Sequence, residues 1–159
     1  MDKKVEAQPI LSMNSVEVLY DNVMLAIKGV SIQVPKGEMI ALLGSNGAGK
    51  STTLKAISGL LKAERGRVSR GEIKFEGTDI TEMLAQKRVE MGICHVIEGR
   101  RVFEHLTPDE NLTAAAPMGM SRSELDGEKE KIYNYFPRLA ERSNSLSGYL
   151  SGGEQQMLA

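Results

Sequence analysis

The chain has 159 residues, of which 41% are hydrophobic, and its formal net charge is −1. This length allows one ordinary domain with a sizeable core. The near-neutral charge argues against a nucleic-acid partner, because proteins that bind nucleic acid carry a basic surplus. No apolar run approaches the roughly 18 residues of a membrane-spanning helix, and the first residues lack the apolar core of a signal peptide. We therefore expect neither nucleic acid as a partner nor direct insertion into a membrane.

The single cysteine and the two histidines carry little chemistry by their positions. One cysteine, Cys94, excludes a disulfide framework and fits a reducing compartment. It lies inside the apolar run 92–97, so we expect a small buried hydrophobic residue and not a reactive thiol. His95 and His105 have no metal-ligand spacing, and we expect them to be structural or surface residues.

The first third of the chain predicts short strands after a loose leader, residues 1–10. Residues 11–20 carry apolar side chains at every second position, which predicts a half-buried strand. Residues 23–27 and 30–34 predict two more short strands. The ring of Tyr20 is either a half-buried aromatic of the first strand or a surface for stacking a nucleotide base. The periodicity alone favours the first interpretation, because aromatic residues favour strands.

A glycine-rich stretch fits the pattern G-x-x-x-x-G-K-[ST] of the phosphate-binding P-loop, and consists of Gly44, Ser45, Asn46, Gly47, Ala48, Gly49, Lys50, Ser51 and Thr52. The apolar run 38–43 before it predicts a buried strand. Apolar residues at i, i+3 and i+7 after it predict one face of a helix: Leu54, Ile57 and Leu61. The alternative is a glycine-rich turn that leads into an ordinary helix. The correctly placed strand and helix favour the P-loop.

The position of this loop explains its chemistry. Between a strand end and a helix start, backbone N–H groups and the helix dipole converge on an anion. Glycines let the backbone approach phosphate oxygens without obstruction by a side chain. We therefore expect Lys50 to reach the β- and γ-phosphates of a nucleotide and the Ser51 hydroxyl to bind Mg²⁺.

The middle of the chain predicts a second strand that points toward the same site. Residues 62–70 are polar and predict a loop, residues 71–77 alternate like an antiparallel edge strand, and residues 81–89 predict a short helix. The apolar run 92–97 predicts a second parallel strand. Ligands of open α/β sheets bind beyond the carboxyl ends of the strands. Glu98 is therefore either close to whatever the P-loop holds or a solvated loop carboxylate.

From Thr107 onward the pattern is helical. Three capping boxes, each a Ser or Thr followed three residues later by Glu, predict helix starts at Thr107, Ser121 and Ser151. Pro137 is expected to end or kink the second helix. In the third box, two glycines lie in the first helical turn and leave backbone N–H groups open to an oxygen ligand.

Several of these features together resemble the ATP-binding subunits of ABC transporters. The sequence Leu150-Ser151-Gly152-Gly153-Glu154 is similar to the family signature, which usually ends in Gln and here ends in Glu154. The resemblance implies that Tyr20 stacks on adenine. It also implies that Glu98 occupies the Q-loop position, where it joins Lys50 in catalysis and Ser51 at Mg²⁺. Residues 96–103 and 106–112 resemble the branched-chain amino acid importer branch.

The same resemblance implies an α/β fold, with a P-loop NTPase (RecA-like) core, an antiparallel β subdomain and an α-helical subdomain. After the leader, we assign residues 11–106 to the incomplete core with its β subdomain. We assign residues 107–150 to the helical subdomain and residues 151–159 to the start of the signature helix.

Family members continue past the signature helix to a strand that ends in Asp-Glu and then to a switch histidine, and the sequence stops before both. We therefore expect the C-terminal part of the core to be missing and the chain to bind nucleotide weakly, with little hydrolysis. Without the neighbouring strand, Ile40, Leu42 and Ile93 face a gap and leave an unpaired edge. We expect a chain that is prone to aggregation.

For the intact parent, the resemblance implies a transport ATPase with ATP and Mg²⁺ as cofactors. Two similar but non-identical subunits form a head-to-tail dimer, in which ATP on one subunit is covered by the signature of the other: Ser151, Gly152, Gly153 and Glu154. Membrane-spanning permease subunits hold the dimer at the cytoplasmic face of the plasma membrane. ATP binding and hydrolysis there drive uptake of branched-chain amino acids or related substrates.

Three other functions stay open from the sequence. One is a non-transport ABC ATPase of DNA repair or translation, which would show a basic surface or a coiled-coil insertion. A second is a GTPase or small-molecule kinase, although no N-K-x-D motif occurs and the signature stretch would go unexplained. The third is a nucleotide-binding fragment without catalysis.

Overall fold

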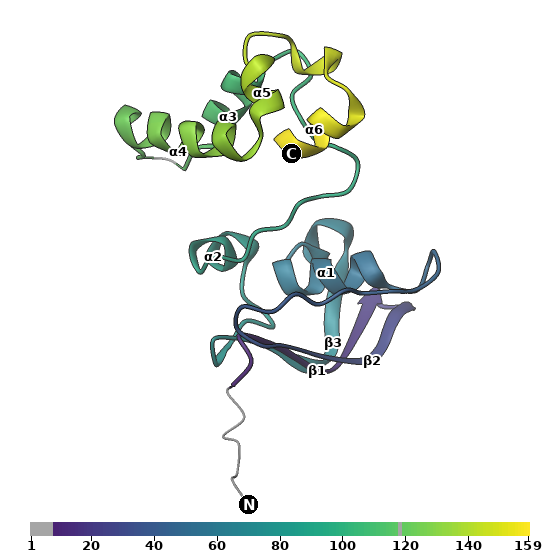
Figure 1. Ribbon diagram of the computed structural model, residues 1–159. Helices are drawn as coiled ribbons and strands as arrows, with labels where there is room; N and C mark the ends of the chain where they lie inside the picture. The colour runs from purple at the N-terminus through teal and green to yellow at the C-terminus, as the bar shows by residue number, and fades with distance from the viewer. Residues whose placement is uncertain (1–7, 118) are drawn as a thin grey trace, which may run out of the picture. The chain divides into compact units, whose positions relative to one another are not determined.

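The computed structural model describes residues 8–117 and 119–159. The chain folds into two compact units, Met1–His95 and Val96–Ala159 (Figure 1). Residues 1–7 of the expected leader lie outside the described residues.

The first unit is built on an antiparallel sheet. β1 (Leu11–Tyr20) lies between β2 (Met24–Val34) and β3 (Gly66–Phe75), and β4 (Thr78–Asp79) pairs with the other side of β3. The strand expected at residues 11–20 is therefore confirmed.

Two strand predictions need correction. Residues 23–27 and 30–34, expected as separate strands, form the single strand β2. The stretch 62–70, expected as a loop, contains a short 3-10 helix, η1 (Leu61–Glu64), and the first half of β3. β3 forms there because its residues pair with the end of β1, with Val68 opposite Val18, and such pairing overrides local polarity.

A bulge in β1 sets which side chains enter the core. The register with β3 shifts between Asn14 and Glu17, and Ser15 has a φ of 48°. A Cβ atom on the facing Gly71 would overlap the carbonyl oxygen of Asn14, so this position requires glycine. The extra residue lets Met13 and Val16, three positions apart, both point inward, and both are buried.

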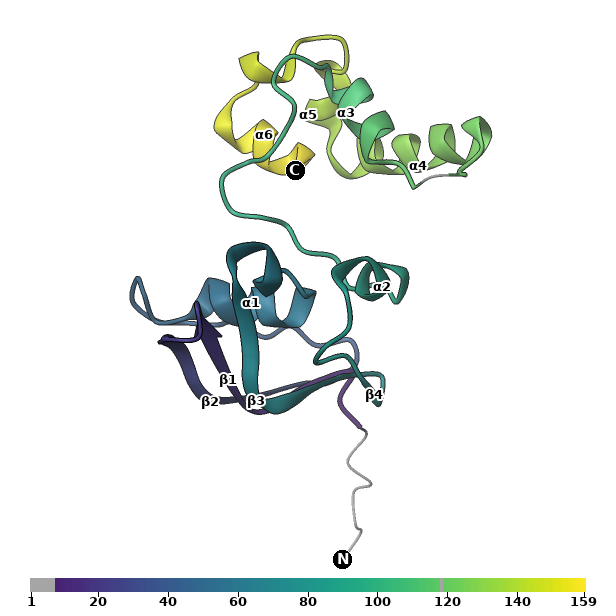
Figure 2. The ribbon, with the colours of Figure 1, turned by 180° about the vertical axis from the view of Figure 1, so that it is seen from behind.

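The helix after the glycine-rich loop, α1 (Lys50–Ser58), lies across one face of the sheet (Figures 1 and 2). Ala56 of this helix joins a core formed with strand and loop residues: Met13, Val16, Val18, Ile27, Leu61, Ile73 and Ile80. The helix is confirmed, but its expected apolar face is only partly so, because Leu54 is 47% exposed.

A buried arginine closes the C-terminal end of α1. Arg88 of α2 (Ala85–Glu90) is 2% exposed. Its guanidinium donates to four backbone carbonyls, those of Ala56, Ile57, Thr81 and Met83. The carbonyls of a last helical turn lack partners within the helix, and Arg88 supplies those for two of them.

Two apolar runs predicted as strands, 38–43 and 92–97, have no regular secondary structure, so these predictions are wrong for this structure. A strand needs a hydrogen-bonded neighbour, and no strand of the described residues pairs with either run. Met39 and Leu43 are therefore exposed, at 94% and 90%. Cys94 is exposed as well, contrary to the expectation that it is buried.

The second unit is helical. It contains α3 (Pro108–Ala115), α4 (Arg122–Tyr135), α5 (Pro137–Glu141), η2 (Ser147–Tyr149) and α6 (Gly152–Leu158). All three expected capping boxes are present, at Thr107, Ser121 and Ser151. Pro137 separates α4 from α5, as expected. Leu139 and Leu150 form part of the buried interior.

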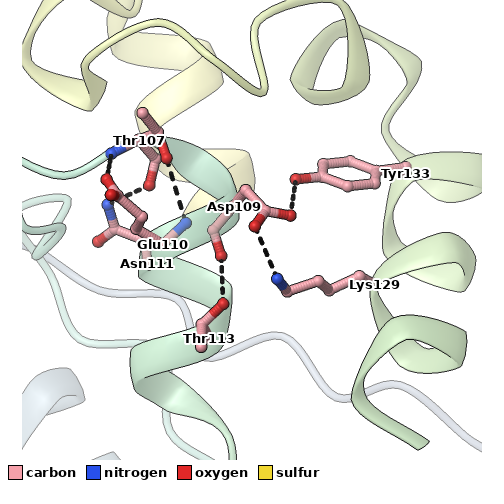
Figure 3. Close-up of polar contacts among 7 residues, drawn as sticks. All are labelled: Thr107, Asp109, Glu110, Asn111, Thr113, Lys129 and Tyr133. Carbon is pink, nitrogen blue, oxygen red and sulfur yellow. Dashed lines mark hydrogen bonds and ion pairs between the residues drawn. The ribbon is translucent and has the colours of Figure 1, made fainter. Parts of the chain in front are cut away.

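Polar side chains join α3 to α4 (Figure 3). Asp109 accepts hydrogen bonds from the Lys129 ammonium at 2.8 Å and from the Tyr133 hydroxyl at 3.3 Å. Burial, together with the negative charge of Asp109, raises the pKa of Tyr133 to about 12. The phenol therefore keeps its proton at neutral pH and remains a hydrogen-bond donor.

The role of Arg88 predicts a large effect on stability. Replacing Arg88 with Met leaves buried carbonyls without donors and should lower the free energy of unfolding by at least about 2 kcal/mol. Lys87→Met on the same helix removes only an exposed ion pair with Glu90 and should cost less than about 0.5 kcal/mol. Urea denaturation of the two variants measures the difference. Equal midpoints would contradict the role of Arg88.

Candidate functional site

The glycine-rich loop 44–52 makes hydrogen bonds to the side chain of its own lysine, Lys50. The Lys50 ammonium donates to the carbonyl oxygens of Gly44 at 2.9 Å and of Ser45 at 2.8 Å. Gly47 and Gly49 have φ values of 84° and 88°, a region that only glycine adopts at low cost. The loop is therefore curved so that the Lys50 ammonium lies against the carbonyls of Gly44 and Ser45.

The first turn of α1 follows directly and has no side-chain cap. Its N-cap residue is Gly49, and no acidic residue lies in the first turn. Helices α3, α4 and α6 differ, because a Ser or Thr and a Glu engage their first amides. An uncapped helix start beside an ammonium group is suited to bind an anion such as phosphate. The Ser51 side chain is exposed in this same turn.

The sheet fixes where the loop lies. A Cβ atom on Gly49 would come within 3.2 Å of the carbonyl oxygen of Ala26 on β2, so the loop backbone packs closely against that strand. Tyr20 ends β1 opposite Met24 of β2. Its half-buried ring packs over Gly66, where a Cβ atom would lie 2.7 Å from the ring. Tyr20 and the loop thus belong to the same unit, and its contact with a base stays a prediction.

Glu98 belongs to the second unit, where it is exposed. It begins a loop with two positive φ values, 98° at Gly99 and 50° at Arg100. Its role at a nucleotide or Mg²⁺ stays a prediction. Of the two histidines, His95 accepts or donates a hydrogen bond at 2.8 Å with Ser58, and His105 is exposed. The expected structural and surface roles of the histidines are confirmed.

The residues Ser151–Glu154 form the start of α6. The Ser151 amide donates to the Glu154 carboxylate at 2.7 Å, and the Glu154 amide donates to the Ser151 hydroxyl at 3.3 Å. This box engages the amides of Ser151 and Glu154, not those of Gly152 and Gly153. The hydrogen bonds from Ser151, with the positive charges of Arg142 and Arg138, lower the pKa of Glu154.

One neighbour of this helix start, Arg100, was not predicted from the sequence. A Cβ atom on Gly152 would come within 2.6 Å of the guanidinium carbon of Arg100. The guanidinium of Arg100, from the loop that follows Glu98, therefore lies close to the first glycine of the Ser151–Glu154 segment. A charged loop arginine carries no periodicity from which this contact is predictable.

The donor set fits Mg²⁺ only in combination with a phosphate ligand. In the described part of the chain, no three His, Cys, Asp or Glu side chains gather in a way that holds a metal ion. Magnesium is commonly held by few protein groups together with phosphate oxygens. The exposed hydroxyl of Ser51, beside Lys50, suits that arrangement.

None of the helices among the described residues is long and apolar enough to cross a membrane.

The chain is similar to known proteins over most of its length. The family model described as "ABC transporter" matches residues 27–159. The chain is 39% identical over 150 residues to the high-affinity branched-chain amino acid transport ATP-binding protein BraG of Pseudomonas aeruginosa. This alignment covers 94% of this chain and 61% of BraG. It is 35% identical over 130 residues to the probable branched-chain amino acid transport ATP-binding protein LivF of Archaeoglobus fulgidus. This alignment covers 82% of this chain and 52% of LivF.

A solved structure of an ATP-binding subunit of an ABC transporter is 30% identical, with a TM-score of 0.73 over 94% of this chain and 59% of that one. The expected α/β fold, with its antiparallel β part and helical part, is therefore confirmed. The chain spans 61% and 52% of the lengths of the two curated relatives.

The cap of α6 predicts a local dependence on pH. The pKa of Glu154 is lowered from its ordinary value of 4.5, so the carboxylate stabilises the cap above that value, and the stabilisation is lost as the pH falls through the lowered pKa. The amide signal of Ser151 in NMR spectra should titrate with a midpoint below 4.5. Glu154→Gln should abolish this titration, whereas Glu124→Gln, in the cap of α4, should leave it intact. A Ser151 signal that titrates in Glu154→Gln would contradict the assignment.

Proposed function

Because the chain belongs to the ABC transporter family, we propose that it is the ATP-binding part of an importer of branched-chain amino acids or related substrates. The single observation that carries the nucleotide assignment is the uncapped start of α1, with Lys50 held beside it by the carbonyls of Gly44 and Ser45. The names of the relatives BraG and LivF support the substrate class.

ATP binds through its phosphates to the loop 44–52 in this proposal. The amides of the first turn of α1 donate to phosphate oxygens, and Lys50 exchanges its two carbonyl acceptors for the β- and γ-phosphates. The exchange is favourable because charge-assisted hydrogen bonds to phosphate are stronger than those to neutral carbonyls. Ser51, with Glu98 as a proposed further ligand, would hold Mg²⁺, and the ion would neutralise negative charge on the phosphates. The ring of Tyr20 stacks on the adenine.

The Ser151–Glu154 segment acts on a second subunit. The amides of Gly152 and Gly153, which the capping box leaves unengaged, donate to the γ-phosphate of ATP bound to the other member of a head-to-tail dimer. ATP then joins the two subunits, and its hydrolysis releases them. We propose a similar but non-identical partner, and permease subunits that hold the dimer at the inner face of the plasma membrane.

A second candidate function is nucleotide binding without turnover by this chain alone. The exposure of Met39 and Leu43, which directly precede the P-loop, favours it. Hydrolysis needs the reacting groups held in a fixed geometry, and a loop that follows an unpaired run is less firmly held. The same exposed residues support the expectation that this chain aggregates.

The P-loop assignment predicts the effect of one lysine. Lys50→Ala removes a charge-assisted donor to phosphate, worth about 1.5–3 kcal/mol, so the Kd for MgATP should rise by about tenfold to 100-fold. Lys55→Ala, at the other end of α1 and paired with Glu64, should bind as the wild type does. Isothermal titration of this chain, and of a version extended to the next stop codon of its reading frame, measures both.

Hydrolysis separates the two candidate functions. We expect Lys50-dependent release of phosphate from the extended version and little from this chain. Turnover by this chain at the rate of the extended version would eliminate the non-catalytic candidate. Binding of MgATP that ignores Lys50→Ala in both versions would overturn the nucleotide assignment itself.

Tyr20 provides a test that is specific for the base. Tyr20→Ala should weaken MgATP binding by about tenfold, because stacking a base on an aromatic ring contributes about 1–3 kcal/mol. The affinity for inorganic tripolyphosphate, which has no base, should not change. Tyr20→Phe keeps the ring and should bind ATP normally. Equal losses for ATP and tripolyphosphate would show that Tyr20 acts through the fold of β1 and not through the base.

A further inference from the structure

Asn111 is a buried residue of α3 with an unusually large number of hydrogen-bond partners. Its exposed fraction is 8%. Its two amide hydrogens are shared among the carbonyls of Phe103 at 3.1 Å, Thr107 at 3.0 Å and Leu106 at 3.4 Å and the hydroxyl of Ser147 at 3.0 Å. Its amide oxygen accepts the backbone N–H of Phe103 at 2.8 Å. Figure 3 shows Asn111 in the first turn of α3, beside the capping box of Thr107.

The hydrogen-bond partners of Asn111 come from two segments of the second unit that are far apart in the sequence. Phe103 and Leu106 lie in the segment that follows Glu98. Ser147 begins η2, the short turn that leads into the Ser151–Glu154 segment. The Asn111 side chain thus joins the loop after Glu98 to η2, the turn that precedes the Ser151–Glu154 segment.

Backbone hydrogen bonds link the same two segments that the Asn111 side chain joins. The Ser147 amide donates to the Leu106 carbonyl at 2.8 Å, and the Gly148 amide donates to the Glu104 carbonyl at 2.9 Å. On the other side of Ser147, its carbonyl accepts the side-chain amide of Gln155 in α6 at 3.1 Å. Ser147 is fully buried. The loop, η2 and α6 are therefore linked through a continuous set of hydrogen bonds that passes through Asn111 and Ser147.

Chemistry limits which residue can hold this position. The site requires N–H donors for carbonyls and a hydroxyl, and an acceptor for a backbone amide. Asn supplies both from one short side chain, whereas Asp supplies only acceptors and Leu neither. In the low dielectric of the interior these bonds are strong, and an unpaired polar group is costly. Among the described residues, no buried side-chain nitrogen or oxygen lacks a hydrogen-bond partner.

We propose that Asn111 is a positioning residue, which fixes the Ser151–Glu154 signature segment relative to the loop that follows Glu98. The inference rests on the proposed function, in which the signature contacts ATP on a second subunit. It adds that a displacement of the loop is passed to the signature through Asn111 and Ser147. In the same loop, the guanidinium of Arg100 lies close to Gly152.

The geometric part of the proposal is testable on the chain itself. Spin labels at Arg101→Cys in the loop and at Gln156→Cys in α6, both exposed positions, report the distance between the two segments by pulsed electron resonance. The native thiol is removed by Cys94→Ser. We expect one narrow distance in the otherwise unchanged chain and the loss of that narrow distance in Asn111→Ala.

Two further variants keep this test decisive. Thr113→Ala, on the same helix, removes only a hydrogen bond to the Asp109 carbonyl and should keep the narrow distance. Ser147→Ala deletes one hydroxyl and should broaden the distance even if Asn111→Ala does not fold. Distances are recorded well below each melting temperature, so lower stability alone leaves them unchanged. A narrow distance in both Asn111→Ala and Ser147→Ala would overturn the proposal.

The functional part uses the version extended to the next stop codon. Asn111→Ala should lower kcat for ATP by as much as about 100-fold, because misplaced contacts are costly in the transition state. The Kd for MgATP at the P-loop should not change. A purely structural role would lower kcat and weaken binding together, and would count against positioning. Failure of Lys50-dependent binding would instead refute the proposed function, while the distance measurement would still decide the role of Asn111.

Discussion

The feature on which the first unit depends is the start of α1, where the chain must hold a positive charge and several free amides together. Helices α3, α4 and α6 satisfy their first amides with a Ser or Thr and a Glu, but α1 begins after Gly49 and has no such cap. Two left-handed glycines make the turn possible, and Lys50 holds it by bonds to the carbonyls of Gly44 and Ser45. These bonds curve the loop around Lys50, while the amides of the first turn remain available for an anion.

The other end of α1 is fixed by groups that take no part in binding. Arg88 satisfies the carbonyls of Ala56 and Ile57, and Ser58 bonds to His95, which ties the helix to the run 92–97. The second unit likewise separates supporting residues from binding residues. Asn111 and Ser147 are buried and hydrogen-bonded to each other, and the Ser151–Glu154 segment lies beyond them at the end of these hydrogen bonds. In both units, buried polar groups with backbone partners support a glycine-rich segment that binds nucleotide in our proposal.

Local chemistry was predictable from the sequence wherever one motif decides the structure. The capping boxes at Thr107, Ser121 and Ser151, the break at Pro137 and the helix after the P-loop all follow from residues a few positions apart. Strands depend on distant partners, so the polar start of β3 was missed, and the runs 38–43 and 92–97 were predicted as strands although no described strand pairs with them. Asn111 and Arg88 escaped prediction for the same reason, because their partners lie in other elements.

The most direct test of the P-loop as the ATP site maps the amide NMR shifts that MgATP produces in the ¹⁵N-labelled chain. We expect large shifts for Gly47, Gly49, Lys50 and Ser51, and small ones for α3 and α4, because the phosphates of ATP bind at the P-loop in our proposal. Shifts confined to residues outside 44–52, or no shifts at nucleotide concentrations that saturate a P-loop, would contradict the assignment of the uncapped start of α1 as the ATP site.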